Sequence, residues 1–150
     1  MATEQANDKQ TIRSMEPEDI DAILEIDRKM SGKRRSVSYK DLISGDIGGD
    51  LDLSFVAEVG GQVVGFVLAR YAYIGEPVIE VGLIQIFGVD PDYWGKGIAT
   101  KLVNSVLERC QSKNLKIVRV MVNERDSLLQ DFFAHLGFHR GQLIDYTKSI

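Results

Sequence analysis

Two glycines separated by one lysine, Gly95-Lys96-Gly97, are the residues of this chain best suited to bind a phosphate group. They follow a nearly continuous apolar run and precede a segment with helical periodicity. Glycine lets the backbone approach a ligand closely, and the first N–H groups of a helix have no partner inside the helix. Such a turn favours phosphate or pyrophosphate, because its N–H groups and the helix dipole both attract negative charge. Many strand-to-helix turns hold two glycines, so the motif alone does not identify the ligand.

Two widespread phosphate motifs do not fit these glycines. The dinucleotide-binding pattern GxGxxG needs a third glycine at position 100, which holds Thr100. The Walker pattern needs glycine at position 90 and serine or threonine at position 97, which hold Asp90 and Gly97. A nucleotide-hydrolysing or dinucleotide-binding protein is therefore disfavoured.

The bulk composition is that of one soluble globular domain. The chain has 150 residues, of which 44% are hydrophobic and 27% are charged. Its net charge of −4 argues against a nucleic-acid partner, and the basic cluster at 33–35 is typical of a solvated turn. No apolar run reaches the roughly 18 residues of a membrane span, and no signal-peptide pattern is visible. We therefore expect no membrane partner and a cytoplasmic location.

Cysteine and histidine usage gives no support to disulfide or metal chemistry. The single cysteine, Cys110, lies on a helical pattern beside Leu107, which favours a packed or half-exposed thiol over a nucleophile. His135 and His139 lack the spacing of an HExxH-type site, so we expect no metal.

Hydrophobic periodicity divides the chain into strands and helices. Residues 1–10 predict a disordered tail, and residues 11–150 predict a single domain with no internal linker. Strands are predicted at 11–15, 53–59, 62–73, 78–89 and 117–122, with one or two more within 138–146. Helices are predicted at 17–29, 97–112 and 127–136, with one or two helical turns at 39–44. This order predicts an α/β (mixed α+β) fold, in which an antiparallel meander feeds a β-α-β unit and helices flank a mixed sheet.

The segment from Val89 to Ala99, VDPDYWGKGIA, resembles the acyl-CoA pyrophosphate loop of the GNAT superfamily of N-acetyltransferases, commonly written Q/R-x-x-G-x-G/A. Gly97 and Ala99 match the pattern, whereas Trp94 stands where Gln or Arg is usual. The helix that ends in Leu136-Gly137-Phe138 is similar to a later motif of the family. The order of elements resembles the family from residue 11 onward, so the resemblance implies a sheet splayed at the cofactor site.

The resemblance implies that acetyl-CoA is the acyl donor. The backbone of Phe87, Gly88 and Val89 would pair with the amides of the pantetheine arm, and the N–H of Ile86 or Phe87 would polarise the thioester carbonyl. Lys96 is either a further charge partner or a solvated loop lysine, and both interpretations stay open. The residues assigned to the cofactor by this resemblance are Phe87, Gly88, Val89, Trp94, Gly95, Lys96, Gly97, Ile98, Ala99, Thr100, Asp126 and Phe133.

The usual general acid of the family is missing. The family often places a tyrosine four residues before the glycine of its later motif, and this chain has Phe133 there. The leaving thiolate can instead take its proton from water or from the substrate ammonium, because a thiol has a pKa near ~8.5. Alternatively another group replaces the acid. The substitutes considered are Tyr146, Tyr73, Tyr71 and Ser127.

A base is also needed, because only a neutral amine attacks a thioester. Glu80 is the first candidate: it lies in an apolar run, where burial would raise its pKa into a useful range. The alternative is a solvent-exposed residue at the start of the strand. Glu124 is the second candidate, and Gln85 can orient a water molecule or the substrate.

Two functions of different class follow. The first is transfer of an acetyl group to a primary amine of a protein or a small molecule; the second is a non-catalytic acyl-CoA-binding sensor or regulator. The acceptor edge is expected around residues 30–39, where Arg34 and Arg35 are either an acid-binding surface or ordinary solvated side chains. A homodimer is expected by family habit alone.

Overall fold

The computed structural model describes residues 9–31 and 51–150. The predicted tail at 1–10, apart from its last two residues, lies outside the described residues. The same holds for the basic cluster at 33–35, the helical turns at 39–44 and nearly all of the expected acceptor edge at 30–39.

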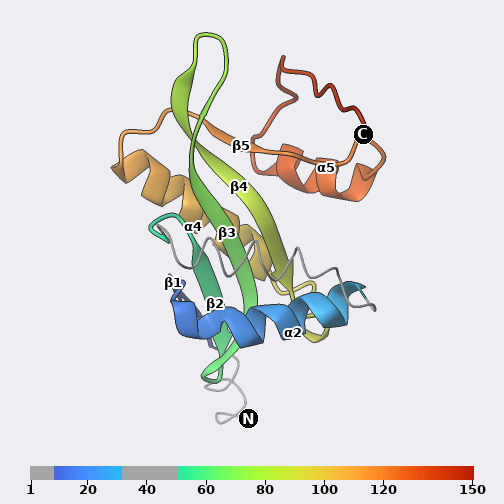
Figure 1. Ribbon diagram of the computed structural model, residues 1–150. Coiled ribbons are helices and arrows are strands. Elements are labelled where there is room, and N and C mark those ends of the chain that lie inside the picture. Colours follow the sequence, from blue (N-terminus) through green and yellow to red (C-terminus); the bar gives the residue numbers. More distant parts are fainter. Residues whose placement is uncertain (1–8, 32–50) are drawn as a thin grey trace.

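A five-stranded sheet forms the centre of the molecule (Figure 1). Its strands follow one another in chain order, and the first three neighbouring pairs are antiparallel while the last is parallel. The strands are β1 (Gln10–Ser14), β2 (Phe55–Val59), β3 (Gln62–Ile74), β4 (Ile79–Val89) and β5 (Val118–Val120). The prediction of a mixed, mostly antiparallel sheet is confirmed.

Helices cover both faces of this sheet. Helix α2 (Ile20–Ser31), which follows a short 3-10 turn at Pro17–Asp19, packs Ile23 and Ile26 on one face. Helix α4 (Ile98–Ser112) packs Leu102 and Val106 on the other, and α5 (Ser127–His135) lies beside the end of the sheet (Figure 1). The continuous apolar run of β4 is explained by this double cover.

Cys110 is part of the contact between α4 and β4. Its side chain is buried, and a Cβ added at Gly82 would lie 2.6 Å from the Cys110 Sγ, so glycine permits the close approach of helix and strand. Burial raises the pKa of the Cys110 thiol to about 11. The expectation of a packed thiol is confirmed.

Two of the predicted strands differ from the structure. The strand predicted at 117–122 is limited to β5, because its pairing with β4 ends at Ile84. The prediction of one or two strands at 138–146 is wrong: this segment pairs with no strand of the described sheet, and residues 139–150 are all exposed. A strand needs a partner as well as a suitable sequence, and this segment has none within the described chain.

Arg13 ties the first strand to the start of α2. Its guanidinium donates to both carboxylate oxygens of Asp19 at 2.9 and 2.8 Å, and to Glu58 at 2.9 Å. Asp19 also accepts the N–H of Glu16 at 2.8 Å, which closes the turn before the helix. Burial acts to raise the pKa of Asp19, but the hydrogen bonds from Arg13 and from the Glu16 backbone outweigh it and hold this pKa below its usual value.

Replacing Arg13 with Gln should lower the free energy of unfolding near neutral pH by about 1–3 kcal/mol, because it removes partners from the buried Asp19. The native pKa of Asp19 is depressed, so its contribution is complete above the unfolded-chain value of 3.8 and is lost as the pH falls through the lower native value. The gap between wild type and variant should therefore narrow in acid. Urea unfolding followed by circular dichroism from neutral to strongly acidic pH measures this. Arg28→Gln, which breaks an exposed pair with Glu25, is the control, and an Arg13 effect independent of pH would contradict the prediction.

Candidate active site

Strand β4 has an edge that the other described strands leave largely uncovered. On one side it pairs with β3 along its whole length, but on the other it pairs with β5 only from Gly82 to Ile84. Beyond Ile84 the two strands part, and residues 85–89 have no strand partner on that side within the described chain (Figure 1). Backbone N–H and C=O groups left in this way need a partner from water or from a ligand.

A β-bulge lies at the start of this open edge. Leu68 of β3 faces Ile86 and the next residue, Ala69, faces Ile84, so Gln85 is an extra residue without a partner on β3. The Gln85 Oε1 atom is buried and has no hydrogen-bond partner within the described residues. A buried acceptor of this kind is costly unless a donor reaches it, so the bulge places an unused hydrogen-bond acceptor where the strands part.

Three phenylalanines form one wall beside the opening. The ring of Phe87 on β4 stacks on Phe132 with centroids 5.9 Å apart, and meets Phe133 edge-on at 5.6 Å. Phe133 also packs on Phe138 at 5.1 Å and is buried. The side chain at the position of the missing acid therefore holds α5 against β4.

The Gly-rich turn joins the end of this edge to α4. Gly95 and Gly97 have φ angles of +77° and +80°, which favour glycine strongly, and a Cβ at either position would meet nothing within 4 Å. Gly97 is the N-cap of α4 and gives it no side-chain cap. The first N–H groups of α4 therefore receive no hydrogen bond from a capping side chain, as an anion site requires.

Trp94 and Lys96, the two large side chains of the turn, have local partners. The Trp94 Nε1–H donates to the carbonyl oxygen of Val89 at 2.7 Å, although most of its ring is exposed. Lys96 Nζ lies 5.8 Å from the centre of the Tyr93 ring. Trp94 thus closes the turn on itself. Asp126, which the resemblance assigned to the cofactor, caps α5 by accepting the N–H of Leu129 at 3.0 Å.

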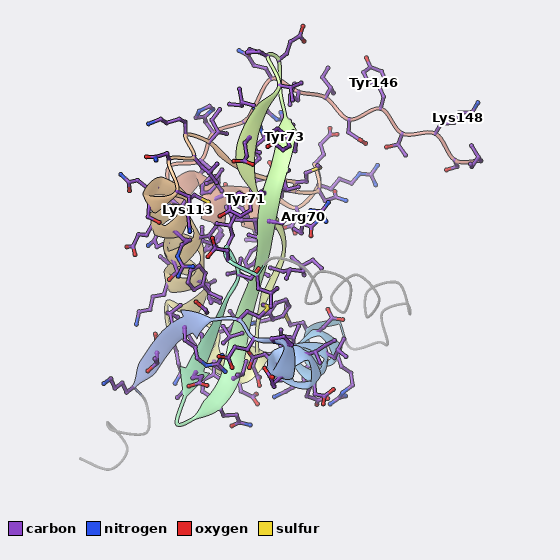
Figure 2. The ribbon with its side chains drawn as sticks, turned by 60° about the vertical axis from the view of Figure 1, so that its left-hand side comes forward. Arg70, Tyr71, Tyr73, Lys113, Tyr146 and Lys148 are labelled. Atoms are coloured by element: carbon purple, nitrogen blue, oxygen red, sulfur yellow. The ribbon has the colours of Figure 1, made fainter. Side chains whose placement is uncertain are left out.

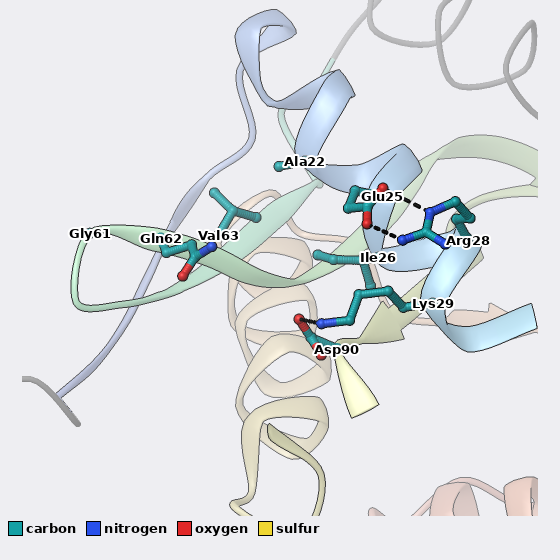
Figure 3. Close-up of a pocket in the computed structure, with 9 residues that line it drawn as sticks. All are labelled: Ala22, Glu25, Ile26, Arg28, Lys29, Gly61, Gln62, Val63 and Asp90. Carbon is teal, nitrogen blue, oxygen red and sulfur yellow. Dashed lines mark hydrogen bonds and ion pairs between the residues drawn. The ribbon is translucent and has the colours of Figure 1, made fainter. Parts of the chain in front are cut away.

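A lysine of α2 reaches across to the same turn. Lys29 Nζ donates to Asp90 at 2.7 Å (Figure 3) and to Asp92 at 3.1 Å, and these bonds raise the pKa of the lysine. Asp90 also accepts the N–H of Asp92 at 3.0 Å. An open cavity of about 470 Å³ lies beside the ion pair, between α2 and the β2–β3 hairpin. This contact was not predicted, because a pair 61 residues apart leaves no local pattern.

Glu80, Glu124 and Tyr146 are not brought together. Glu80 is exposed at the start of β4, so the expected burial is wrong and the solvent-exposed alternative is confirmed. The hydrogen bond to Glu80 raises the pKa of Tyr73, which makes this tyrosine a weaker acid. Glu124 is exposed in the turn after β5, and Tyr146 lies on the projecting C-terminal segment (Figure 2).

The other substitute acids also have fixed positions. The Tyr71 hydroxyl donates to Asp52 at 2.8 Å, in a network with Arg109 and Lys113. Ser127 is exposed at the first position of α5.

Within residues 9–31 and 51–150 no three His, Cys, Asp or Glu side chains are grouped to hold a metal ion. No described helix is long and apolar enough to cross a membrane.

Comparison with known proteins identifies the family. The model of the "Acetyltransferase (GNAT) family" matches residues 20–138, which is most of the chain and includes the open strand, the Gly-rich turn and α5. The chain belongs to this family. An uncharacterised N-acetyltransferase of Methanocaldococcus jannaschii is 34% identical over 96 residues, which are 63% of this chain and 42% of that relative. This GNAT chain thus spans less than half of the length of that relative.

Solved structures share the GNAT fold over nearly the whole chain. A possible acetyltransferase from Clostridium difficile 630 superposes with a TM-score of 0.79 at 19% identity, covering 94% of this chain and 97% of that one. The aminoglycoside acetyltransferase AAC(6')-Iy, in complex with a CoA bisubstrate analogue, gives 0.76 at 18%, covering 95% and 99%. Arabidopsis thaliana Naa50, in complex with CoA-Ac-MVNAL, gives 0.70 at 18%, covering 89% and 85%.

Replacing Lys29 with Met should loosen the Gly-rich turn while leaving global stability nearly unchanged. The pair is partly exposed, so its loss should cost less than about 1 kcal/mol. Amide hydrogen exchange at residues 91–97 should nevertheless become faster, because Asp90 and Asp92 lose their common tether. Arg28→Met is the matched control, one residue away with a partner on its own helix. Equal exchange rates in the two variants would show that Lys29 does not hold the turn.

Proposed function

We propose that this chain transfers an acetyl group from acetyl-CoA to a primary amine. The observation that carries the proposal is the continuity of the open β4 edge with the Gly-rich turn. A strand edge suits an extended molecule with amide groups, and the turn at its end suits a pyrophosphate. Coenzyme A has both parts in that order. The CoA complexes of AAC(6')-Iy and of Naa50 support the same cofactor.

The residues present fit CoA. Open space beside Gly95 and Gly97 admits a phosphate close to the backbone, and the N–H groups of Ile98, Ala99 and Thr100 supply donors at the start of α4. Backbone groups of residues 87–89 are available for the pantetheine amides. Phe87 and Phe132 offer apolar surface to the arm. Trp94 would support CoA binding by holding the shape of the turn, and Asp126 by capping α5. Lys96 stays a candidate charge partner of the pyrophosphate.

The chemistry at the thioester needs little from the chain beyond placement. When bound, acetyl-CoA supplies the acetyl group as a thioester, and its thiol leaves as the amine nitrogen takes that group. An N–H of Ile86 or Phe87, beside the bulge, would donate to the carbonyl oxygen as negative charge develops there. The Gln85 Oε1 would accept an N–H of the attacking amine and orient it. Glu80, Glu124 and Tyr146 are retained as proposed proton carriers that act through solvent, because all three side chains are exposed.

The acceptor class is proposed only as a primary amine. The complexes of two structural neighbours hold different acceptor parts, acetylneamine in one bisubstrate analogue and MVNAL in the other. The fold therefore accepts more than one kind of amine. Residues 30–39, which we expect at the acceptor edge, would choose between them.

Replacing Gly97 with Ala should weaken CoA binding at least about tenfold. The φ of +80° costs alanine about 1–2 kcal/mol, and the added methyl group enters the space proposed for the pyrophosphate. Isothermal titration with CoA measures the effect. Gly61→Ala is the control, because its φ of +78° and open surroundings impose the same strain on the β2–β3 hairpin. If both variants lose equal affinity, the glycine does not form the phosphate cradle.

The decisive experiment follows thiol release from acetyl-CoA with a panel of amines, including aminoglycosides, peptides with free N-termini and lysine peptides. Some amine should accelerate release and be recovered as its acetylated product. Gln85→Met should lower kcat/KM for that amine about 10–100-fold, as expected for one lost hydrogen bond to a reacting group, without changing the Kd of CoA. The variant should also be at least as stable as wild type, because methionine removes an unsatisfied buried oxygen.

The second function, a non-catalytic acyl-CoA sensor, has its own observation in its favour. Phe133 stands where the family often has a tyrosine, and it is buried among other phenylalanines. If CoA binds with the predicted dependence on Gly97 and no amine accelerates thiol release, the sensor replaces the enzyme. If CoA does not protect the chain from thermal unfolding at all, both functions fail.

A further inference from the structure

A row of three side chains crosses the sheet on the face opposite α4. Arg70 of β3 (Figure 2) faces Leu83 of β4, and Leu83 faces Arg119 of β5. Partners in a ladder project on the same face of a sheet, and successive residues of a strand project on opposite faces. Gly82, the residue before Leu83, lies against Cys110 of α4. Leu83 and its two partners therefore project away from that helix.

Arg119 carries a positive charge that no described carboxylate neutralises. It takes part in no ion pair within residues 9–31 and 51–150, and its buried Nε has no hydrogen-bond partner there. Its Nη1 and Nη2 lie 3.4 and 3.7 Å from the places where Gly141 and Gly75 would carry a Cβ, so two residues without side chains flank the guanidinium. A buried donor left unpaired is costly, and a carboxylate is the group that matches a guanidinium best.

The strand beside Arg119 holds a matching acceptor. Gln85 Oε1 and Arg119 Nε are the two buried side-chain atoms without a hydrogen-bond partner in the described part of the chain. Gln85 comes two residues after Leu83, the ladder partner of Arg119. At about 3.3 Å per residue and about 4.8 Å between strands, the two backbone positions are at least about 8 Å apart. One atom accepts and the other donates, so a ligand that satisfies both carries an N–H group and an oxyanion.

Apolar side chains lie between these two polar groups. Leu83 is half-buried, and Met121, two residues after Arg119, is 76% exposed. Val120 and Val122 pack in the core on the α4 side, so Met121 projects on the same face as Arg119. Apolar surface at this place suits a short chain of methylene groups.

We propose that the acetyl acceptor is a small amine joined by several methylene groups to a carboxylate, which Arg119 binds while Gln85 holds the amine. This specificity rests on the proposed acetyl transfer, and the reaction is unchanged. The amine nitrogen takes the acetyl group as the C–S bond of the thioester breaks, the thiolate leaves with CoA, and one amine proton passes to solvent. The α-amine of an amino acid is too close to its carboxylate to span the two side chains. An ω-amino acid, or the side-chain amine of a lysine-like amino acid, has the required length.

Acceptors that differ only in charge test this specificity. 6-Aminohexanoate and 6-aminohexanamide share the same amine and chain, but the amide lacks the carboxylate. The wild type should acetylate the acid with a kcat/KM about 10–100-fold above that of the amide, as expected for one hydrogen-bonded charge pair. The same ratio for 3-aminopropanoate and its amide should be near one, because the two groups of this shorter acid cannot reach both side chains.

Substitutions of Arg119 decide whether this residue causes the preference. Arg119→Gln should bring the acid-to-amide ratio to within about twofold of one, and Arg119→Lys should keep part of it, because an ammonium binds a carboxylate without the planar fork. Arg28→Gln removes the same charge from an exposed pair and should leave the ratio as in the wild type. Circular dichroism and the Kd of CoA check that each variant is folded. If Arg119→Gln does not fold, a wild-type ratio in Arg119→Lys overturns the assignment.

Calorimetric titration of the CoA-saturated protein with 6-aminohexanoate measures binding without turnover. Arg119→Gln should raise its Kd at least about tenfold. If amines are acetylated with no preference for the acid, or if the preference survives in Arg119→Gln, the inference fails and the acetyl transfer stands. If 6-aminohexanoate binds through Arg119 but no amine accelerates thiol release, the acetyl transfer fails and the Arg119 site stands. If the acid is neither bound nor preferred, the inference is wrong.

Discussion

The site depends on one constraint: within the described chain, β4 pairs with β3 along one side except at a single bulge, whereas on the other side only Gly82 to Ile84 are paired. A backbone that leaves a sheet partner while still packed between helices must find new partners for its N–H and C=O groups. Here α2 and α4 pack apolar side chains on the two faces of β4. These side chains offer no hydrogen-bond partners to the N–H and C=O groups at the edge of the strand. The bulge at Gln85 marks the residue where the regular ladder on the β3 side is interrupted as well. Strand separation, bulge and open edge are therefore parts of one feature.

The Gly-rich turn connects the open edge of β4 to the positive end of the α4 dipole. Positive φ angles at Gly95 and Gly97 turn the chain sharply from β4 into α4, so that the free end of the helix dipole lies next to the free edge of the strand. The ion pairs of Lys29 connect this turn to α2, which precedes the expected acceptor edge in the chain.

The limits of sequence reasoning follow from the range of each interaction. The glycine turn and the double cover of β4 were predictable, because positive φ and apolar periodicity depend on neighbouring residues. For Glu80 the sequence left burial and exposure both open, since the outcome depends on how far β4 extends beyond β5. Residues 138–146 have a strand-like sequence, yet a strand exists only with a partner, and pairing is not a local property. Lys29–Asp90 and Arg13–Asp19 were missed for the same reason: they join separate elements.

For the proposed acetyl transfer, the lack of a general acid at Phe133 costs less free energy than deprotonation of the amine. A thiol with a pKa near ~8.5 leaves as a thiolate at a cost of about 2 kcal/mol at neutral pH, which water can offset by protonation afterwards. An alkylammonium with a pKa near ~10.4 must lose its proton first, at about 4–5 kcal/mol. Gln85 cannot take that proton, because an amide oxygen is a hydrogen-bond acceptor and not a base at this pH. In the proposed mechanism Gln85 only holds the amine beside the thioester. Deprotonation then falls on a carboxylate, on water or on the fraction of amine that is already neutral.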